Sequence, residues 1–239
     1  MAHLALGIDF GSLSGRAVLI DAATGETVAS AVCGYEHGFI EDRLPGTGET
    51  LPPDWTLQDP QDYLAVLAQV IPAVLHEAGA SASDVIGVGT DFTSSTVLPV
   101  KRDGTPLCFL PEFRADKHAW VKVWKHHAAQ ADANRLNAVA AERNEAFLSR
   151  YGGKVSSEWL IPKLWQILNE APHLYAAMDR FIEATDWIVL QLSGQERRSS
   201  CAAGYKALWN KKEGYPSDDF FRSLDPRLEH IVEDRKSVV

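Results

Sequence analysis

The chain has 239 residues, a formal net charge of −9 and an apolar fraction of 46%. This acidic balance argues against a general binder of nucleic acid or anionic membranes. The sequence has no run of 18 apolar residues and no basic-then-apolar N-terminus, so it predicts neither a membrane span nor secretion. The cysteines match no zinc-binding spacing and indicate a reducing, cytoplasmic location; they are Cys33, Cys108 and Cys201.

The first part of the chain has the pattern of a sheet with one crossover helix. Strands are predicted over residues 4–8, 17–20 and 26–32. Their short connections predict an antiparallel meander, and a long irregular segment follows over residues 34–58. Asp59 predicts the start of a helix whose apolar stripe ends at Gly79. The run DVIGVGTDF (84–92) then predicts a strand that returns parallel to the first.

The remainder of the chain is predicted to be mainly helical. The stretch TVLPVKRDGTPLCFL (96–110) predicts a hairpin that turns at Asp103-Gly104. Helices are predicted over residues 115–142, 156–171 and 185–192. These elements together predict an α/β domain with a mixed sheet, and no internal repeat or shift in composition indicates a second domain.

The connection between the first two strands carries more polar groups than a hairpin needs. In LGIDFGSLSGRAVLID (6–21), Asp9 ends a strand, and Ser12, Ser14 and Arg16 follow it. A carboxylate beside exposed backbone N–H groups and short hydroxyls can hold a hydrated metal ion next to phosphate oxygens. The simpler interpretation is a Gly/Ser-rich turn with a surface arginine. The stretch is neither a P-loop nor a dinucleotide-binding fingerprint.

This stretch resembles the first phosphate motif of the FGGY family of carbohydrate kinases. Further similar segments follow in order: DWTLQDPQDYL, IGVGTDFTSSTVLPV, WVKVWKHHAAQ, RYGGKVSSEWLIPKLWQILNEAP, EATDWIVLQLSG and CAAGYKALWNKKEGYP. The resemblance implies that residues 1–236 are the N-terminal domain of such a kinase, with a ribonuclease-H-like, actin-like ATPase fold whose mixed sheet has helices on both faces. Residues 237–239 do not continue the pattern. The C-terminal ATP-binding domain, with its catalytic aspartate, is therefore expected beyond residue 239.

The resemblance also implies roles for individual residues in binding Mg-ATP. Asp9 would position magnesium through water, beside the ATP phosphates. Gly11, Ser12 and Ser14 would line the phosphate loop, and Arg16 belongs to the same motif. The family often has threonine at the position of Ser12, and serine keeps the hydroxyl group.

Three further positions match the sugar-binding residues of the family: Ser94, Trp124 and Lys206. An indole ring offers a flat apolar surface to the C–H face of a sugar. A lysine donates hydrogen bonds to sugar hydroxyl or carbonyl oxygens. The residue types therefore suit the roles that the resemblance implies.

The implied activity is ATP-dependent phosphorylation of a ketopentose. The stretches KHHAAQ and GYKALW are similar to members that act on L-ribulose and form L-ribulose 5-phosphate. The alternatives are another FGGY kinase, acting on xylulose or glycerol, a sugar-binding module without catalysis, or a structural member of the actin-like fold. Without a catalytic aspartate the isolated chain is expected to be inactive, and a homodimer through the exposed interdomain face is a further expectation.

Other residues with chemical potential have ordinary structural explanations. Four tryptophans lie on helical patterns that are typical of core packing: Trp120, Trp124, Trp159 and Trp165. His126 and His127 resemble a metal-binding pair, but adjacent helical residues point about 100° apart and rarely share a metal. Asp91 and Asp186 lie near motif strands, where they are interpreted as helix caps or loop anchors.

Overall fold

A computed structural model describes residues 3–234, so the predicted tail at 237–239 lies outside the described residues. The chain divides into two compact units. The first unit contains the segment up to Ile40 and Gln58–Thr93, and the second contains Glu41–Leu57 and the segment from Ser94 onward. In the part that is described, no helix is both long and apolar enough to cross a membrane.

The first unit is built on a four-stranded sheet in the order β3-β2-β1-β5. Its strands are β1 (Leu4–Phe10), β2 (Ser14–Asp21), β3 (Thr27–Gly34) and β5 (Val85–Phe92). β1, β2 and β3 are antiparallel neighbours, while β5 runs parallel to β1. The predicted meander and the predicted parallel crossover are both confirmed.

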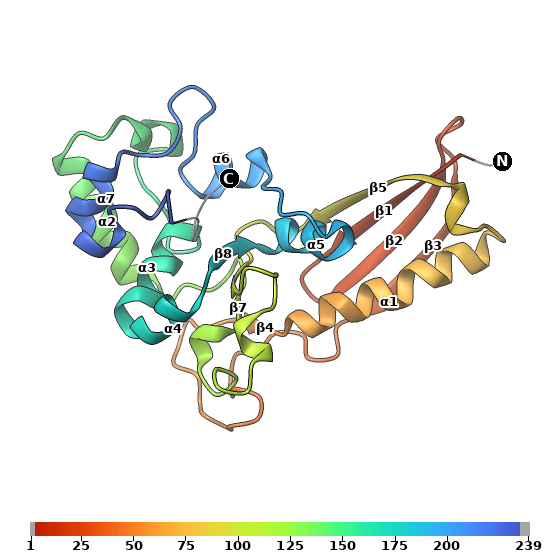
Figure 1. The fold of residues 1–239 in the computed structure, drawn as a ribbon, viewed down its shortest axis with the longest axis horizontal. Coiled ribbons are helices and arrows are strands. Elements are labelled where there is room, and N and C mark those ends of the chain that lie inside the picture. The colour runs from red at the N-terminus through yellow and green to blue at the C-terminus, as the bar shows by residue number, and fades with distance from the viewer. Residues whose placement is uncertain (1–2, 235–239) are drawn as a thin grey trace. The chain divides into compact units, whose positions relative to one another are not determined.

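Helix α1 (Pro60–Glu77) lies along one face of this sheet (Figure 1). Asp59 caps the helix, because its carboxylate accepts a hydrogen bond from the backbone N–H of Gln61 at 2.9 Å. Residues of β1 alternate between buried and partly exposed, as a sheet with one covered face requires. The prediction of helices on both faces is therefore wrong for this sheet, since among the described residues Val32, Ile86 and Val88 of its strands are exposed. The buried core contains Leu4, Leu6, Ile8, Phe10, Tyr63, Val66, Val70 and Val74.

The second unit contains a smaller sheet with several helices. Its strands, in the order β4-β7-β6-β8, are β4 (Leu57–Gln58), β7 (Val121–Lys122), β6 (Val97–Val100) and β8 (Arg180–Glu183). Its helices are α2 (Gln130–Glu142), α3 (Leu160–Glu170), α4 (Pro172–Ala177), α5 (Ala184–Ser193), α6 (Ser200–Lys206) and α7 (Asp218–Leu224). The α/β class predicted from the sequence is confirmed, with the strands divided between two sheets.

The helix predicted over residues 115–142 is wrong for its first half, since α2 begins only at Gln130. The preceding segment contains a 3-10 turn and β7. Asp116 caps that turn by accepting from the backbone N–H of His118 at 2.8 Å, and Val97 of β6 pairs with Lys122. Contacts with distant parts of the chain therefore override the helix propensity of this segment.

The predicted hairpin over residues 96–110 is correct at its turn but not in its second arm. Lys101 N–H donates to the Thr105 carbonyl at 2.8 Å across the turn at Asp103-Gly104. Beyond it, residues 107–109 form a 3-10 turn, and pairing is limited to a bridge between Val100 and Pro106. Proline lacks the N–H that a continued ladder needs. The two other predicted helices are confirmed with small shifts, as α3 and α5.

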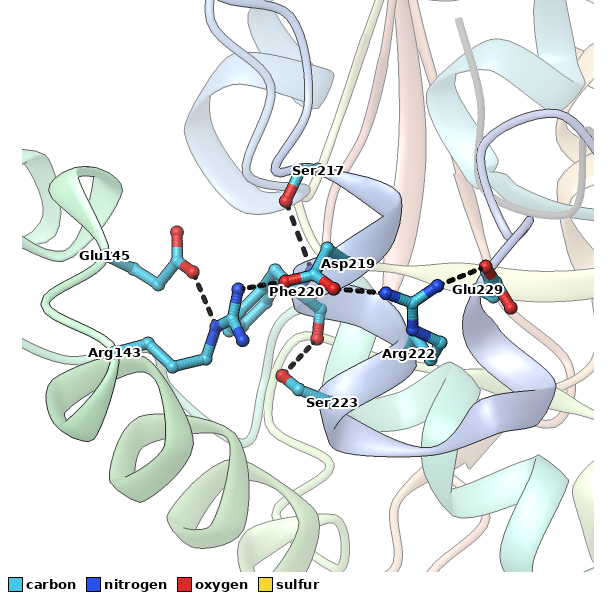
Figure 2. Close-up of polar contacts among 8 residues, drawn as sticks. All are labelled: Arg143, Glu145, Ser217, Asp219, Phe220, Arg222, Ser223 and Glu229. Atoms are coloured by element: carbon cyan, nitrogen blue, oxygen red, sulfur yellow. Dashed lines mark hydrogen bonds and ion pairs between the residues drawn. The ribbon is translucent and has the colours of Figure 1, made fainter.

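Helix α7 is held by a chain of exposed ion pairs and by its buried face (Figure 2). Asp219 contacts both Arg143 and Arg222, and Arg222 reaches Glu229 at 2.8 Å. Ion pairs at such exposed positions contribute little because water and salt screen them. Phe220, by contrast, is fully buried and packs its ring against another phenylalanine, so burial is the main stabilising term here.

Gly15 gives a direct test of how closely β2 approaches α1. A Cβ atom at this position would lie 2.3 Å from Cγ1 of the fully buried Val66. Gly15→Ala should therefore lower the free energy of unfolding by about 1–3 kcal/mol, the usual cost of overpacking. Gly34→Ala, in the neighbouring strand, meets nothing within 4 Å and is the matched control. Equal urea-unfolding midpoints for the two variants would contradict this close approach.

Candidate functional site

The loop between β1 and β2 is a tight turn whose backbone is closed by a hydrogen bond from Gly11 N–H to the Ser14 carbonyl at 2.9 Å. A Cβ atom on Gly11 would lie 3.2 Å from that carbonyl, so the turn favours glycine. Ser12 is only partly exposed, while Asp9 and Arg16 occupy the strand ends on either side. The predicted hairpin is confirmed, and the five residues assigned to phosphate binding lie together in it.

The carbonyl groups of this loop are held by side chains and backbone from other parts of the first unit. The Tyr35 hydroxyl donates to the Gly11 carbonyl at 2.9 Å, and the Tyr35 N–H donates to the Leu13 carbonyl at 3.0 Å. The Gln58 amide donates to the Ser12 carbonyl at 2.8 Å. Tyr63 in turn donates to the Gln58 side-chain oxygen at 2.6 Å. The loop is therefore fixed before any ligand binds.

These supporting residues were missed by the sequence interpretation. Tyr35 lies 24 positions and Gln58 lies 46 positions from its partner in the loop. Gln58 does fall in the DWTLQDPQDYL segment, which was the one available signal. Burial and the nearby Asp9 charge raise the pKa of the Tyr35 hydroxyl, so it stays protonated and acts as a donor.

Asp9 and Arg16 face each other across β1 and β2 on the face of the sheet opposite α1. Arg16 Nε lies 3.3 Å from Asp9 Oδ2, and both side chains are substantially exposed. Asp91 of β5 is the register partner of Asp9, so the two carboxylates share one face of the sheet. The interpretation of Asp91 as a helix cap or loop anchor is therefore wrong. Asp186 does anchor a loop, since it accepts from Ser199 N–H at 2.7 Å.

A cavity of about 560 Å³ lies over this face. Its lining combines the three charged groups with small residues, among them Gly7 and Gly89. Small residues let a ligand approach the backbone closely, and the guanidinium supplies a donor for phosphate oxygens. The arrangement can accept a phosphate group together with a hydrated divalent cation.

The three predicted sugar-binding residues all belong to the second unit. Lys206 ends α6 and lines a cavity of about 400 Å³, together with Arg150, Tyr151, Trp159, Tyr205 and Trp209. Its ammonium group lies 5.4 Å from the ring centre of Trp159 and 5.0 Å from that of Tyr205. Such a cavity, with aromatic walls and a few polar groups, suits a sugar. The predicted core role of Trp159 is only partly correct, since it is half-buried and lines this cavity.

Ser94 and Trp124 do not line the Lys206 cavity. Ser94 is exposed in the turn after β5, and Trp124 is 40% exposed in the turn after β7. Trp124 does not lie on a helix, and its exposure separates it from Trp120 and Trp165, which are fully buried as predicted. An exposed indole in a turn is available to a ligand.

His126 and His127 do not form a metal site. His126 is fully buried, where its Nδ1 accepts from Thr56 N–H at 3.4 Å and its Nε2 meets the Gln166 side-chain oxygen at 3.1 Å. Burial lowers the pKa of His126 well below its usual value. In the described part of the chain, no group of three or more His, Cys, Asp or Glu residues could hold a metal ion.

Comparison with known sequences decides the family. Residues 4–237 match the sequence model for the N-terminal domain of the FGGY family of carbohydrate kinases. The chain belongs to this family. FGGY kinases use ATP as the phosphoryl donor and a sugar as the acceptor.

Curated relatives of this FGGY chain include ribulokinases. It is 58% identical over 228 residues to the ribulokinase of Geobacillus thermodenitrificans, covering 95% of this chain and 40% of the relative. It is 49% identical over 232 residues to the ribulokinase of Mycolicibacterium smegmatis, covering 96% of this chain and 41% of the relative. The chain thus spans about two fifths of the length of the curated relatives it matches.

Solved FGGY structures confirm the fold. The xylulose kinase of Lactobacillus acidophilus superposes with a TM-score of 0.70 at 15% identity, over 99% of this chain and 42% of that one. The xylulose kinase of Rhodospirillum rubrum gives a TM-score of 0.67 at 20% identity, over 98% and 42%. The predicted actin-like kinase fold is therefore confirmed. At these identities the likeness extends to the fold alone.

The hydrogen bonds that hold the loop between β1 and β2 predict the effect of Gln58→Leu. This change keeps the side-chain size but removes the amide that donates to the partly buried Ser12 carbonyl and accepts from the Tyr63 hydroxyl. It should destabilise the first unit by about 1–3 kcal/mol, as measured by urea unfolding. Gln61→Leu makes the same change at an exposed position of α1 and should have little effect. Similar losses in both variants would show that the Gln58 contacts are unimportant.

A second prediction concerns the contact between His37 and Asp62, 2.8 Å apart beside the same loop. The hydrogen bond to Asp62 raises the pKa of His37 above its usual value of about 6.5. A raised folded-state pKa adds stability below pH about 6.5, and this stability is lost as the pH rises through the folded-state pKa. Asp62→Asn should bring the His37 pKa, followed by NMR, back towards 6.5 and flatten this pH dependence of unfolding. Glu77→Gln, on an exposed part of α1, should leave both unchanged.

Proposed function

We propose that this chain provides the sugar-binding region and first phosphate motif of a kinase that converts L-ribulose to L-ribulose 5-phosphate with ATP. The observation that carries the proposal is its 58% identity, across 95% of its length, to a protein named ribulokinase. The proposed domain is residues 1–236, which agrees closely with the region 4–237 that matches the family model and draws on both compact units.

The phosphate motif suits Mg-ATP. Asp9 would hold magnesium through water, and Gly11, Ser12 and Ser14 would surround a phosphate group. Arg16 would donate to phosphate oxygens. The fit is supported by the exposed carboxylate of Asp9 beside a cavity with small-residue walls, and by a loop whose carbonyl groups are turned to internal partners. Magnesium supplies charge neutralisation of the phosphates when it is bound.

The sugar would be held by residues of the second unit. Lys206 supplies a charged donor within a cavity of aromatic walls, and the exposed ring of Trp124 offers a stacking surface. Ser94 adds a small exposed hydroxyl after β5. Together these groups provide the mixture of flat apolar surface and directed donors that a ketopentose needs.

Phosphoryl transfer also requires a carboxylate near the attacking hydroxyl group. Asp186 is mostly buried and occupied in anchoring Ser199, so it does not suit this role. We therefore expect sugar binding by this chain but no turnover.

The alternative substrates and functions have less support. The structurally similar xylulose kinases share only 15–20% identity with this chain. Identity at this level supports a common fold but not a common substrate. A sugar-binding module without catalysis would bind the sugar but not the nucleotide. A homodimer stays a prediction, and a cytoplasmic location is consistent with three free cysteines.

Calorimetry with L-ribulose tests the proposal. The chain should bind L-ribulose more tightly than xylulose or glycerol, and Lys206→Met should weaken this binding about tenfold or more, since a hydrogen bond to a charged group is worth about 1.5–3 kcal/mol. Lys212→Met, an exposed lysine outside the cavity, is the matched control. ADP formation with Mg-ATP and L-ribulose should be absent. Sugar-dependent ADP at kinase rates would show that a carboxylate of this chain completes the site.

A further inference from the structure

Lys163 of α3 is fully buried, yet its ammonium group is well provided with acceptors. Nζ donates to the Ser95 carbonyl at 2.7 Å and to the Val123 carbonyl at 2.8 Å, and it lies 3.5 Å from the Lys122 carbonyl. An ammonium group has three donors, so these three carbonyls match its capacity. The lysine thus joins two irregular backbone segments that are far apart in the sequence.

The first segment is the turn after β5, which contains Ser94. Ser95 has a φ of +66° and is buried, and its hydroxyl has no hydrogen-bond partner among the described residues. A serine adopts this left-handed conformation only where the surroundings impose it. The hydrogen bond from Lys163 to the Ser95 carbonyl is one contact that does so. It therefore also fixes the direction of the adjoining Ser94.

The second segment is the turn after β7, which contains Trp124. Val123 is fully buried and its N–H donates to the Thr56 carbonyl at 3.3 Å, while its own carbonyl accepts from Lys163 Nζ at 2.8 Å and from the His126 N–H at 3.0 Å. The next residue, Trp124, has no support of this kind from a helix or strand. The orientation of its indole therefore depends on how the Val123 peptide is held.

We propose that Lys163 is a positioning residue of the sugar site. By holding the carbonyl groups of Ser95 and Val123, it fixes the positions of the adjoining Ser94 and Trp124 relative to each other. The inference rests on the proposed function, since it assigns Lys163 to the same site. α3 is buried along most of its length, so it provides a rigid base for this bridge. A side chain that holds both segments at once keeps their separation constant, which a ligand spanning both residues requires.

The electrostatic surroundings agree with this geometry. Burial lowers the pKa of Lys163 to about 7, and the charge of Lys206 lowers it further, while Glu183 and Glu158 raise it. Burial likewise raises the pKa of Glu183 to about 8. The backbone N–H of Ser95 and the charge of Lys163 oppose this rise, so Glu183 is an acidic neighbour of both Lys163 and the Ser95 peptide. The charge of Lys163 therefore depends on its burial and on three charged neighbours: Glu183, Glu158 and Lys206.

The test uses the 239-residue chain labelled with 5-fluorotryptophan, with the resonance of Trp124 assigned through Trp124→Phe. Lys163→Met removes the bridge. Lys163→Met alone leaves the buried carboxyl group of Glu183 without its basic neighbour, which is strongly destabilising. The double variant Lys163→Met with Glu183→Gln removes this carboxyl group as well. Glu183→Gln alone is the control for the double variant. Lys101→Met, at a lysine that also donates to a backbone carbonyl (that of Ala177) but contacts neither segment, is the matched control for binding.

In the folded double variant, the Trp124 resonance should shift or broaden and the Kd for L-ribulose should rise about tenfold or more. The resonance of Trp187, whose indole donates to the Gly104 carbonyl at 2.7 Å, should stay in place. Unchanged binding or an unchanged Trp124 resonance would overturn the proposal, as would loss of folding in both Lys163 variants. If the unmodified chain binds no L-ribulose, the proposed function fails, and the Trp124 resonance still decides whether Lys163 positions this residue.

Discussion

Carbonyl groups in irregular segments impose the main constraint on this chain, because each needs a donor once water is excluded. In the first unit, Tyr35 and Gln58 supply donors to the loop between β1 and β2. In the second unit, Lys163 supplies them to the segments beside Ser94 and Trp124. The same solution thus recurs in both units. These carbonyl groups are therefore satisfied within the protein, by donors from other segments.

Features that depend on neighbouring residues could be predicted from the sequence. The meander, the turn at Asp103-Gly104 and the cap at Asp59 each follow from the local pattern of apolar residues, glycine and short polar side chains. The residues around Asp9 could also be placed together, because a hairpin joins strands that are adjacent in the sequence. The fold family and the candidate site residues came from the resemblance of the motifs to a known family. They could not be derived from the spacing of residues.

Features that depend on distant partners could not be predicted. The segment before α2 is rich in alanine and lysine and favours a helix by composition, but Asp116 and the pairing of Lys122 with β6 give it a different backbone. Asp91 reaches the face of Asp9 only through the register of β5 against β1. Likewise, nothing near Gln58 in the sequence indicates that its amide binds the Ser12 carbonyl.

Two buried lysines differ in how strictly their contacts fix the backbone around them. Lys122 and Lys163 both lie fully buried, and loss of hydration lowers the pKa of each. An apolar residue of similar size would avoid this cost. The two lysines meet different partners, however: the ammonium of Lys122 lies 4.1 Å from the ring centre of Trp55, whereas that of Lys163 meets backbone carbonyls. A cation over a ring tolerates small displacements, but hydrogen bonds to carbonyl groups are directional. Of these two lysines, Lys163 is therefore the one whose contacts define the position of the backbone around it.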